Sequence, residues 1–322
     1  MARVAQESPA VPGSASSGAV VTVDHLRKTY AEGIGVQDVS FSVGRGEIFG
    51  IIGPNGAGKT TTVECISGMR TPQSGVIRVL GLDPQTDRAT IRERVGVQLQ
   101  ESQLQPFVKV GEILDLFASF YRCPADPAEL TDALGLAAKR GAYFRRLSGG
   151  QKQRLSIALA LIGNPQLAIL DELTTGLDPQ ARRDTWELIE HVRDRGVTVI
   201  LVTHYMDEAE RLCDRVLLID HGTVAALDTP AGLAQRASGG THLRFVPSIP
   251  LADRVLTVLP EVSEIAREGG RIRVTGTGDV VTAVIRALEA AGVQARDIQV
   301  ESATLDDAYV RLTHHREEAV RP

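Results

Sequence analysis

The chain has little that would tie it to nucleic acid, to disulfide bonds or to a cysteine metal site. Its net charge of -5 gives no basic field, so nucleic acid is not an expected partner. Its only cysteines, Cys65, Cys123 and Cys213, are far apart and odd in number, which suits a reducing cytosol. Aromatic residues are scarce at 4%, yet 43% hydrophobic and 23% charged residues make the composition globular.

A long hydrophobic run is also missing. The best apolar run, residues 155–170, is broken at 163–166 and is short of the roughly 20 residues that a transmembrane helix requires. The N-terminus has no apolar segment typical of a secretory signal. We therefore expect any membrane role to depend on another chain. The length of 322 residues allows one large domain with a smaller one, or two modest domains.

One motif dominates what is present. Residues 53–60, Gly-Pro-Asn-Gly-Ala-Gly-Lys-Thr, fit the phosphate-binding pattern G-x-x-x-x-G-K-[ST]. The preceding residues 48–52 predict a buried strand, and residues 61–69 predict a helix. In that order, backbone N–H groups and the positive end of the helix converge on an anion. Lys59 would reach the outer phosphates and the Thr60 hydroxyl would hold Mg²⁺, so the motif predicts nucleoside triphosphate binding.

Two further apolar strands end in residues that suit this chemistry. Residues 167–170 form a buried-type strand that ends at Asp171 and Glu172, where Asp can hold Mg²⁺ and Glu can orient and deprotonate water. A solvated pair of loop carboxylates is the simpler alternative, but four consecutive apolar residues disfavour it. The strand at 198–203 ends in His204. A single His is more often a structural cap, and it gains significance only if its strand lies beside the other two.

The remaining pattern indicates two domains. Residues 1 to about 18 are rich in Ala, Ser, Pro and Gly, and predict a disordered leader. Short strands, a helical insertion at about 101–147 and alternating apolar segments predict an α/β domain over about 20–235.

A boundary rich in Gly, Ser and Pro follows at 228–240. Residues 240–313 then show a β-α-β-β-α-β order, which predicts a small ferredoxin-like α+β domain ending in a helix at 304–312. The charged end, 314–322, is expected to fray.

The other motifs are weak alone and strong together. Residues 147–151, Leu-Ser-Gly-Gly-Gln, precede an apolar helix for which Ser148 is the predicted N-cap. Combined with the motifs above, they make the chain resemble the nucleotide-binding subunit of an ATP-binding-cassette (ABC) transporter over about residues 20–235. Residues 147–151 match the signature that separates this family from other P-loop ATPases. The implied fold is a P-loop cassette with a RecA-like parallel sheet, an antiparallel β subdomain and a helical insertion.

The resemblance also implies roles for residues that carry no signal alone. Tyr30 matches the aromatic residue that stacks on adenine, and Gln100 the glutamine that touches Mg²⁺ and senses the membrane partner. Glu172 matches the catalytic glutamate, His204 the switch histidine, and Asp178 belongs to the D-loop. The residues expected to contact ATP or its Mg²⁺ are Tyr30, Gly53, Pro54, Asn55, Gly56, Ala57, Gly58, Lys59, Thr60, Thr61, Gln100, Ser148, Gly149, Gly150, Gln151, Asp171 and Asp178, of which Thr60, Gln100 and Asp171 would hold the metal.

Within the family, the chain is similar to the detached ATPases of type-2 exporters, the daunorubicin-resistance-like group. The similarity rests on a single cassette, on Thr-His-Tyr-Met-Asp-Glu-Ala at 203–209 and on the pattern at 304–313. It implies ATP hydrolysis, a second ATPase chain that we expect to be identical, a separate membrane permease, and a place at the cytoplasmic face of the membrane. Leu173 departs from the family, which usually has Pro there, and would loosen the turn after Glu172.

Three alternatives remain at this stage. A soluble ABC ATPase acting on ribosomes or DNA usually has tandem cassettes, a basic linker or a coiled coil, none of which the sequence shows. An importer ATPase shares the core motifs, and only the C-terminal domain disfavours it. A regulatory ATP-binding module without turnover is disfavoured by Glu172 and His204.

Overall fold

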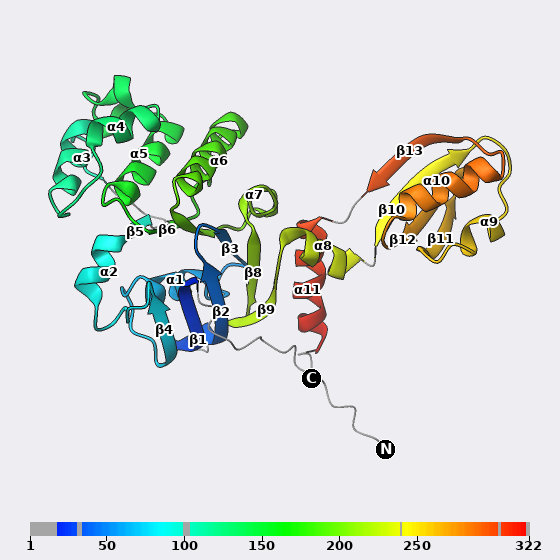
Figure 1. The fold of residues 1–322 in the computed structure, drawn as a ribbon, viewed down its shortest axis with the longest axis horizontal. Coiled ribbons are helices and arrows are strands. Elements are labelled where there is room, and N and C mark those ends of the chain that lie inside the picture. The colour runs from blue at the N-terminus through cyan, green and yellow to red at the C-terminus, as the bar shows by residue number, and fades with distance from the viewer. Residues whose placement is uncertain (1–17, 31–33, 99–103, 239, 302–303, 320–322) are drawn as a thin grey trace, which may run out of the picture.

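The computed structural model describes residues 18–30, 34–98, 104–238, 240–301 and 304–319 (Figure 1). All but the last residue of the predicted leader, and also Gln100, lie outside these ranges. Among the helices of the described ranges, none is long and apolar enough to cross a membrane.

A parallel sheet forms the centre of the large domain. Its strands lie in the order β8 (Arg215–Asp220), β3 (Ile48–Ile52), β7 (Thr198–Val202), β6 (Leu167–Asp171) and β5 (Val95–Gln98). Every residue of β3, β6 and β7 is buried, because successive side chains pack into hydrophobic clusters on opposite faces of the sheet. Burial on both faces explains why these strands are unbroken apolar runs in the sequence.

An antiparallel layer continues this sheet. Strands β4 (Ser74–Val79), β1 (Ala19–Thr29) and β2 (Gly35–Gly44) pair in that order, and β9 (Thr223–Asp228) forms a hairpin with β8. The predicted antiparallel subdomain is therefore confirmed. Helices α1 (Lys59–Ile66) and α2 (Arg88–Arg94) add Val63, Ile66 and Ile91 to the cluster on this side.

The opposite face of the sheet is covered by helices, including the predicted insertion. The helices on this face are α3 (Val110–Ala118), α4 (Pro127–Ala133), α5 (Gly149–Leu161), α6 (Pro179–Asp194), α7 (Met206–Leu212) and α8 (Pro230–Ser238), with 3₁₀ turns at Ala137–Lys139 and Phe144–Arg146. Their apolar side chains form one cluster with alternate residues of the parallel strands.

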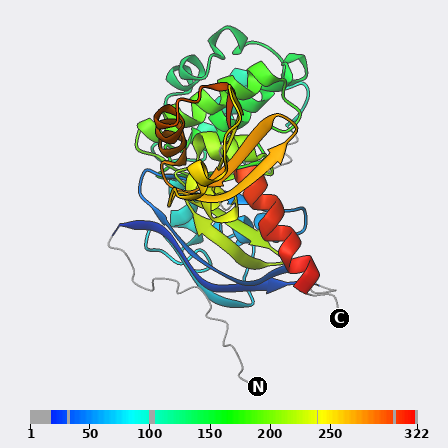
Figure 2. The same ribbon diagram turned by 90° about the vertical axis from the view of Figure 1, so that its right-hand side faces the viewer.

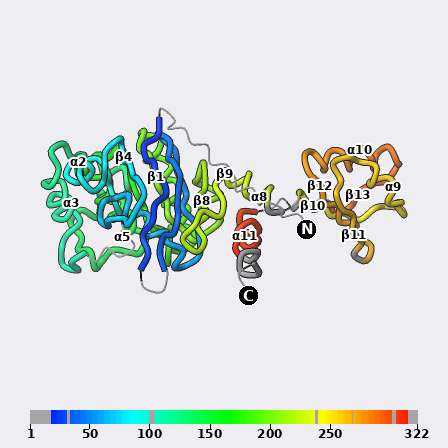
Figure 3. The backbone as a smooth tube through the Cα atoms, turned by 90° about the horizontal axis from the view of Figure 1, so that it is seen from below, coloured from blue at the N-terminus to red at the C-terminus, as the bar shows by residue number. Residues whose placement is uncertain are grey.

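The C-terminal region has a separate core. A four-stranded antiparallel sheet lies in the order β11-β12-β10-β13, and Phe245, Val274 and Val284 are among the residues buried between it and its helices. The element order is the predicted β-α-β-β-α-β, and the ferredoxin-like assignment stays a prediction drawn from that order. Its elements are β10 (Thr241–Pro247), α9 (Arg254–Thr257), β11 (Val262–Glu268), β12 (Arg271–Gly276), α10 (Val280–Ala290) and β13 (Ala295–Glu301), which stand apart from the large domain (Figure 3).

The terminal helix differs from the sequence prediction. Helix α11 (Leu305–Ala319) continues past residue 312, so the segment expected to fray from 314 is helical as far as Ala319. It packs on α7 and α8 of the large domain, apart from the small one (Figure 1), and Figure 2 shows its length. Leu305 and Ala308 are buried in the cluster of the large domain, and the Leu305 N–H donates to the Glu210 carboxylate. Apolar residues at helical spacing predict a buried face, but not which domain buries it.

Candidate nucleotide site

Three chain segments meet at one edge of the parallel sheet. Strand β7 lies between β3 and β6, with Val199 paired to both Ile48 and Ala168. Because the carboxyl ends of parallel strands share an edge, the glycine loop after β3, Glu172 after β6 and His204 after β7 come together there. The strand that precedes His204 thus lies beside the other two strands, which was the condition for a functional role of His204.

The glycine loop curls around the amine of Lys59. The Lys59 Nζ donates to the carbonyl oxygens of Gly53 at 2.8 Å and Pro54 at 3.1 Å. Gly53 has φ of 151°, and a Cβ there would lie 2.1 Å from the Ile219 carbonyl oxygen, so only glycine fits. Burial lowers the pKa of Lys59, and the charges of Glu172 and Asp171 oppose that decrease.

The loop forms one wall of a hollow of about 380 Å³. Glu172 and His204 also line it, so the predicted base and switch share this hollow with the predicted phosphate loop. Tyr30 is 40% exposed and does not line the hollow, although its N–H donates at 2.8 Å to the carbonyl of Ile34, which does. The residues that line the hollow are Ile34, Gly35, Asn55, Gly56, Gly58, Lys59, Thr60, Thr61, Glu172 and His204.

Asp171 is poised to receive a cation. Its side chain is 1% exposed, and among the described residues its Oδ2 has no hydrogen-bond partner. Burial, reinforced by the charge of Glu172, raises the pKa of Asp171 to about 6. A buried carboxylate oxygen without a donor fits Mg²⁺, together with the Thr60 hydroxyl and phosphate oxygens. Within the described ranges no group of three or more His, Cys, Asp or Glu side chains could hold a metal.

Glu172 and His204 are in contact with each other. The Glu172 Oε1 lies 3.3 Å from the His204 Nδ1. Glu172 has a left-handed backbone with φ of 49°, and its N–H donates to the Val202 carbonyl at 2.9 Å. Leu173, which stands where the family usually has Pro, is fully buried in the helical cluster. The effect of Leu173 on the turn after Glu172 stays a prediction.

Sequence reasoning missed the residues behind His204. The centres of the Tyr205 and His204 rings lie 4.1 Å apart. The Arg182 guanidinium lies 4.5 Å from the centre of the Tyr205 ring. Arg182 also pairs with Asp207 at 3.3 Å. Tyr205 adjoins His204 in sequence and could have been singled out, whereas Arg182 on α6 carries no signal without the fold.

A buried carboxyl group lies on the first turn of α7. Glu208 is fully buried and accepts from the Trp186 Nε1 at 3.2 Å. Burial raises the pKa of Glu208, and the hydroxyl groups of Thr203 and Thr174 oppose that rise. Glu208 on α7 is therefore connected to α6 through Trp186.

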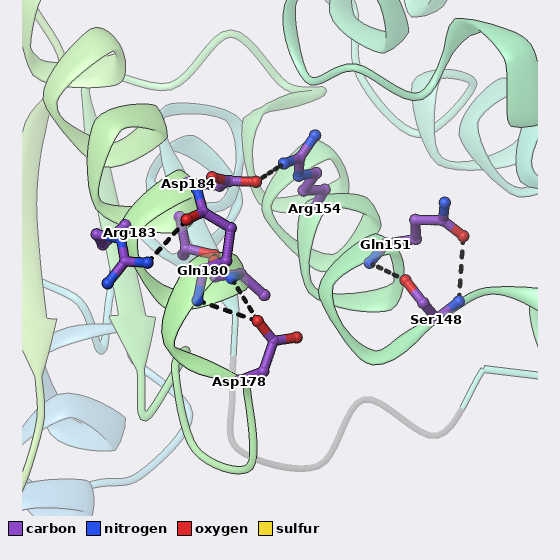
Figure 4. A network of polar contacts seen from close by, with 9 residues as sticks. Ser148, Gln151, Arg154, Asp178, Gln180, Arg183 and Asp184 are labelled. Atoms are coloured by element: carbon purple, nitrogen blue, oxygen red, sulfur yellow. Dashed lines mark hydrogen bonds and ion pairs between the residues drawn. The ribbon is translucent and has the colours of Figure 1, made fainter.

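The signature residues line a different hollow. Ser148 is the N-cap of α5, as predicted: its Oγ accepts the Gln151 N–H at 3.3 Å, and the Gln151 Oε1 accepts the Ser148 N–H at 3.1 Å (Figure 4). Asp178 caps α6 in the same way, accepting the N–H groups of Gln180 and Ala181. Both helix ends open into a hollow of about 490 Å³, which is separate from the one at Lys59.

The fold and this site define the chain as a P-loop nucleoside triphosphatase. Residues 36–175 match the family model described as ABC transporter. The chain is 36% identical over 313 residues to the Nod factor export ATP-binding protein I of Ralstonia nicotianae, covering 95% of this chain and 97% of that protein. It is 33% identical over 301 residues to the daunorubicin resistance ATP-binding protein DrrA3 of Streptomyces coeruleorubidus, covering 91% and 95%.

A solved structure agrees with these relatives. It is a dimeric ATP-binding cassette in a post-hydrolysis state bound to ADP and Pi, with a TM-score of 0.58 and 25% identity over 65% of this chain and 98% of that one. The chain belongs to the ABC transporter family, and it is an ATP-binding cassette of the ATP-hydrolysing kind. The resemblance predicted from its motifs is confirmed, including the group that contains the daunorubicin-resistance ATPases.

Proposed function

We propose that this chain is the ATPase subunit of an exporter and drives a separate permease from the cytoplasmic face of the membrane. One observation carries the proposal most directly: the phosphate loop, Glu172 and His204 share one hollow, while residues 148–151 line another. A single chain thus presents two half-sites. Two chains arranged head to tail would bring each phosphate loop against the signature residues of the other.

Each residue of the first half-site has a distinct role in this proposal. Lys59 exchanges its two carbonyl partners for the outer phosphates, and Tyr30 stacks on adenine. Thr60 and Asp171 would hold Mg²⁺, which would neutralise phosphate charge, and the resemblance implies the same role for Gln100, which lies outside the described residues. Glu172 accepts a proton from the attacking water, and His204 donates to the γ-phosphate.

The second half-site makes assembly of the dimer depend on ATP. Ser148 to Gln151 contact the γ-phosphate of the ATP that the other chain binds, through backbone N–H groups at the start of α5. These contacts exist only with ATP present, so ATP favours the closed dimer and hydrolysis removes that preference. We expect the two chains to be identical, because one sequence contains both half-sites in full.

An apolar surface on the helical insertion suits the permease. Phe107, Leu116 and Phe120 are 65%, 51% and 66% exposed, and the Arg145 guanidinium covers Phe107 at 4.5 Å. These exposed apolar side chains fall within one short stretch of the chain, 107–120, and such residues are typical of interaction surfaces. Helix α3 of the insertion packs in the same hydrophobic cluster as the signature helix α5, so a permease bound to this surface could follow dimer closure. The two relatives described above are named for export of a Nod factor and for resistance to a drug, which supports export.

The test compares three versions of the full chain. Glu172→Gln should bind ATP like the unchanged protein, hydrolyse it at least 100-fold more slowly, and accumulate as a dimer in size-exclusion chromatography with ATP and Mg²⁺. Lys59→Ala is the matched control, because it should lose ATP binding and dimerisation together. Hydrolysis by Glu172→Gln at the unchanged rate would refute the assignment of the base.

Export is tested separately from ATP hydrolysis. The tagged chain, purified from membranes, should bring with it a permease of about six transmembrane helices. A ribosome as the main partner would favour the non-transport alternative, and a substrate-binding importer complex would favour the importer. Phosphate release by the unchanged chain no faster than that of Lys59→Ala would favour the regulatory module.

A further inference from the structure

An ion pair joins the signature helix to the helix that follows the D-loop. The Arg154 Nη2 on α5 lies 2.7 Å from the Asp184 Oδ2 on α6. The other carboxylate oxygen of Asp184 accepts from the Gln180 Nε2, also at 2.7 Å, and the Gln180 Oε1 accepts from the Arg183 Nη2 at 2.8 Å. Figure 4 shows the two helices side by side with this network between them. Asp184 is therefore held through both oxygens.

The pair lies at the two helix ends that form the second half-site. Arg154 is on the first turns of α5, which begins after its cap Ser148, and Asp184 is on the first turns of α6, which begins after its cap Asp178. Both members of the pair line the hollow of about 490 Å³ together with Ser148 and Asp178. A Cβ at Gly135 would lie 2.8 Å from the Arg154 Nη1, so the turn after α4 closes over the same guanidinium.

The position of the pair matters more than its contribution to folding. Its side chains are 29% and 34% exposed, and pairs this accessible contribute little to stability. An Arg–carboxylate contact does, however, restrict the angle and distance between the two elements that carry it. Here those elements are α5 and α6, whose buried side chains begin one residue later, at Leu155 and Thr185, so the ion pair joins their more exposed N-terminal turns.

We propose that Arg154 and Asp184 are positioning residues for the half-site that each chain lends to the other. They hold the N-terminus of α5 at a set distance from that of α6, so Ser148 and Asp178 meet the second chain as one surface. The inference rests on the proposed function, in which two chains close over ATP. Breaking the pair impairs the half-site that this chain presents to the second chain. It leaves the chain's own ATP-binding hollow intact.

The test uses the full chain with Glu172→Gln, in which ATP holds the dimer closed. Arg154→Asp and Asp184→Arg are each added to it, and then both together, which restores the pair with its charges exchanged. Each single change should weaken ATP-dependent dimerisation about ten-fold, and the exchange should recover most of that loss. ATP affinity of the monomer should stay within about two-fold in all of them.

Two controls separate positioning from loss of fold. Arg78→Asp breaks a comparable exposed ion pair, Arg78 with Asp83 at 2.8 Å, in the antiparallel layer, and should leave dimerisation unchanged. Arg154→Gln removes one charge without adding its opposite, and gives the same test if the exchanged variants melt early. If the single variants fold and dimerise as well as the Glu172→Gln chain does, the inference is overturned and the proposed function stands. Absence of ATP-dependent dimers in the Glu172→Gln chain itself would overturn both.

Discussion

Replacing Asp171 with Asn should make the protein more stable while removing its activity. Asp171 is buried beside Glu172, and its Oδ2 has no hydrogen-bond partner among the described residues. Its pKa is raised from 3.8 to about 6, chiefly by burial. At about 1.4 kcal/mol per pH unit, this rise corresponds to about 3 kcal/mol of unfavourable free energy in the folded, charged state. The Asp171→Asn variant would have no charge to bury at this position.

The effect should depend on pH with a definite sign. A carboxyl group with a raised folded pKa favours folding when it is protonated, so its contribution is complete below pH 3.8 and is lost as the pH rises through about 6. The stability gap between Asp171→Asn and the unchanged protein should therefore be largest at pH 7.5. It should shrink steadily towards pH 4.5, where the folded protein carries Asp171 mainly in its uncharged form.

Thermal unfolding without nucleotide or Mg²⁺ provides the measurement. For a domain of this size, about 3 kcal/mol raises the melting temperature by roughly 6–12 °C at pH 7.5. ATP hydrolysis should fall at least 100-fold, because the variant loses a metal ligand. A variant that melts below the unchanged protein at pH 7.5, or a gap that is the same at both pH values, would refute the reasoning about the buried charge.

Four shorter predictions follow from the same structure. Lys59→Ala should weaken ATP binding at least ten-fold, measured by titration calorimetry, because it removes the buried amine of the phosphate loop. Leu305→Ala should destabilise the large domain by about 2–4 kcal/mol in urea unfolding, while Leu256→Ala should destabilise only the small one, since each belongs to a different core. Tyr205→Ala should lower kcat with little change in ATP affinity, because the ring supports His204 and lines no part of the hollow. Of the three cysteines, only exposed Cys123 should react with a thiol reagent in the folded protein.

The core of the site could be predicted from the sequence because its parts are local. Residues 53–60 form a loop between a strand and a helix whatever the rest of the chain does, and the apolar run at 167–170 must end where Asp171 begins. Parallel strands buried on both faces then bring such strand ends to one edge, so even the position of His204 followed once its strand was recognised. The N-cap role of Ser148 is equally local, since it depends on Gln151 three residues later.

What only the tertiary structure decided depends on contacts between distant elements. The sequence predicted a terminal helix at 304–312 for the small domain, but the partners of α11, α7 and α8, precede it by some 70 to 100 residues and belong to the large domain. Arg154 and Asp184 look like surface charges in the sequence, and become a link between two half-site helices only when α5 lies against α6. The raised pKa of Asp171 likewise comes from the burial of its whole strand. Local patterning determined which residues carry the chemistry, and packing determined how they are held.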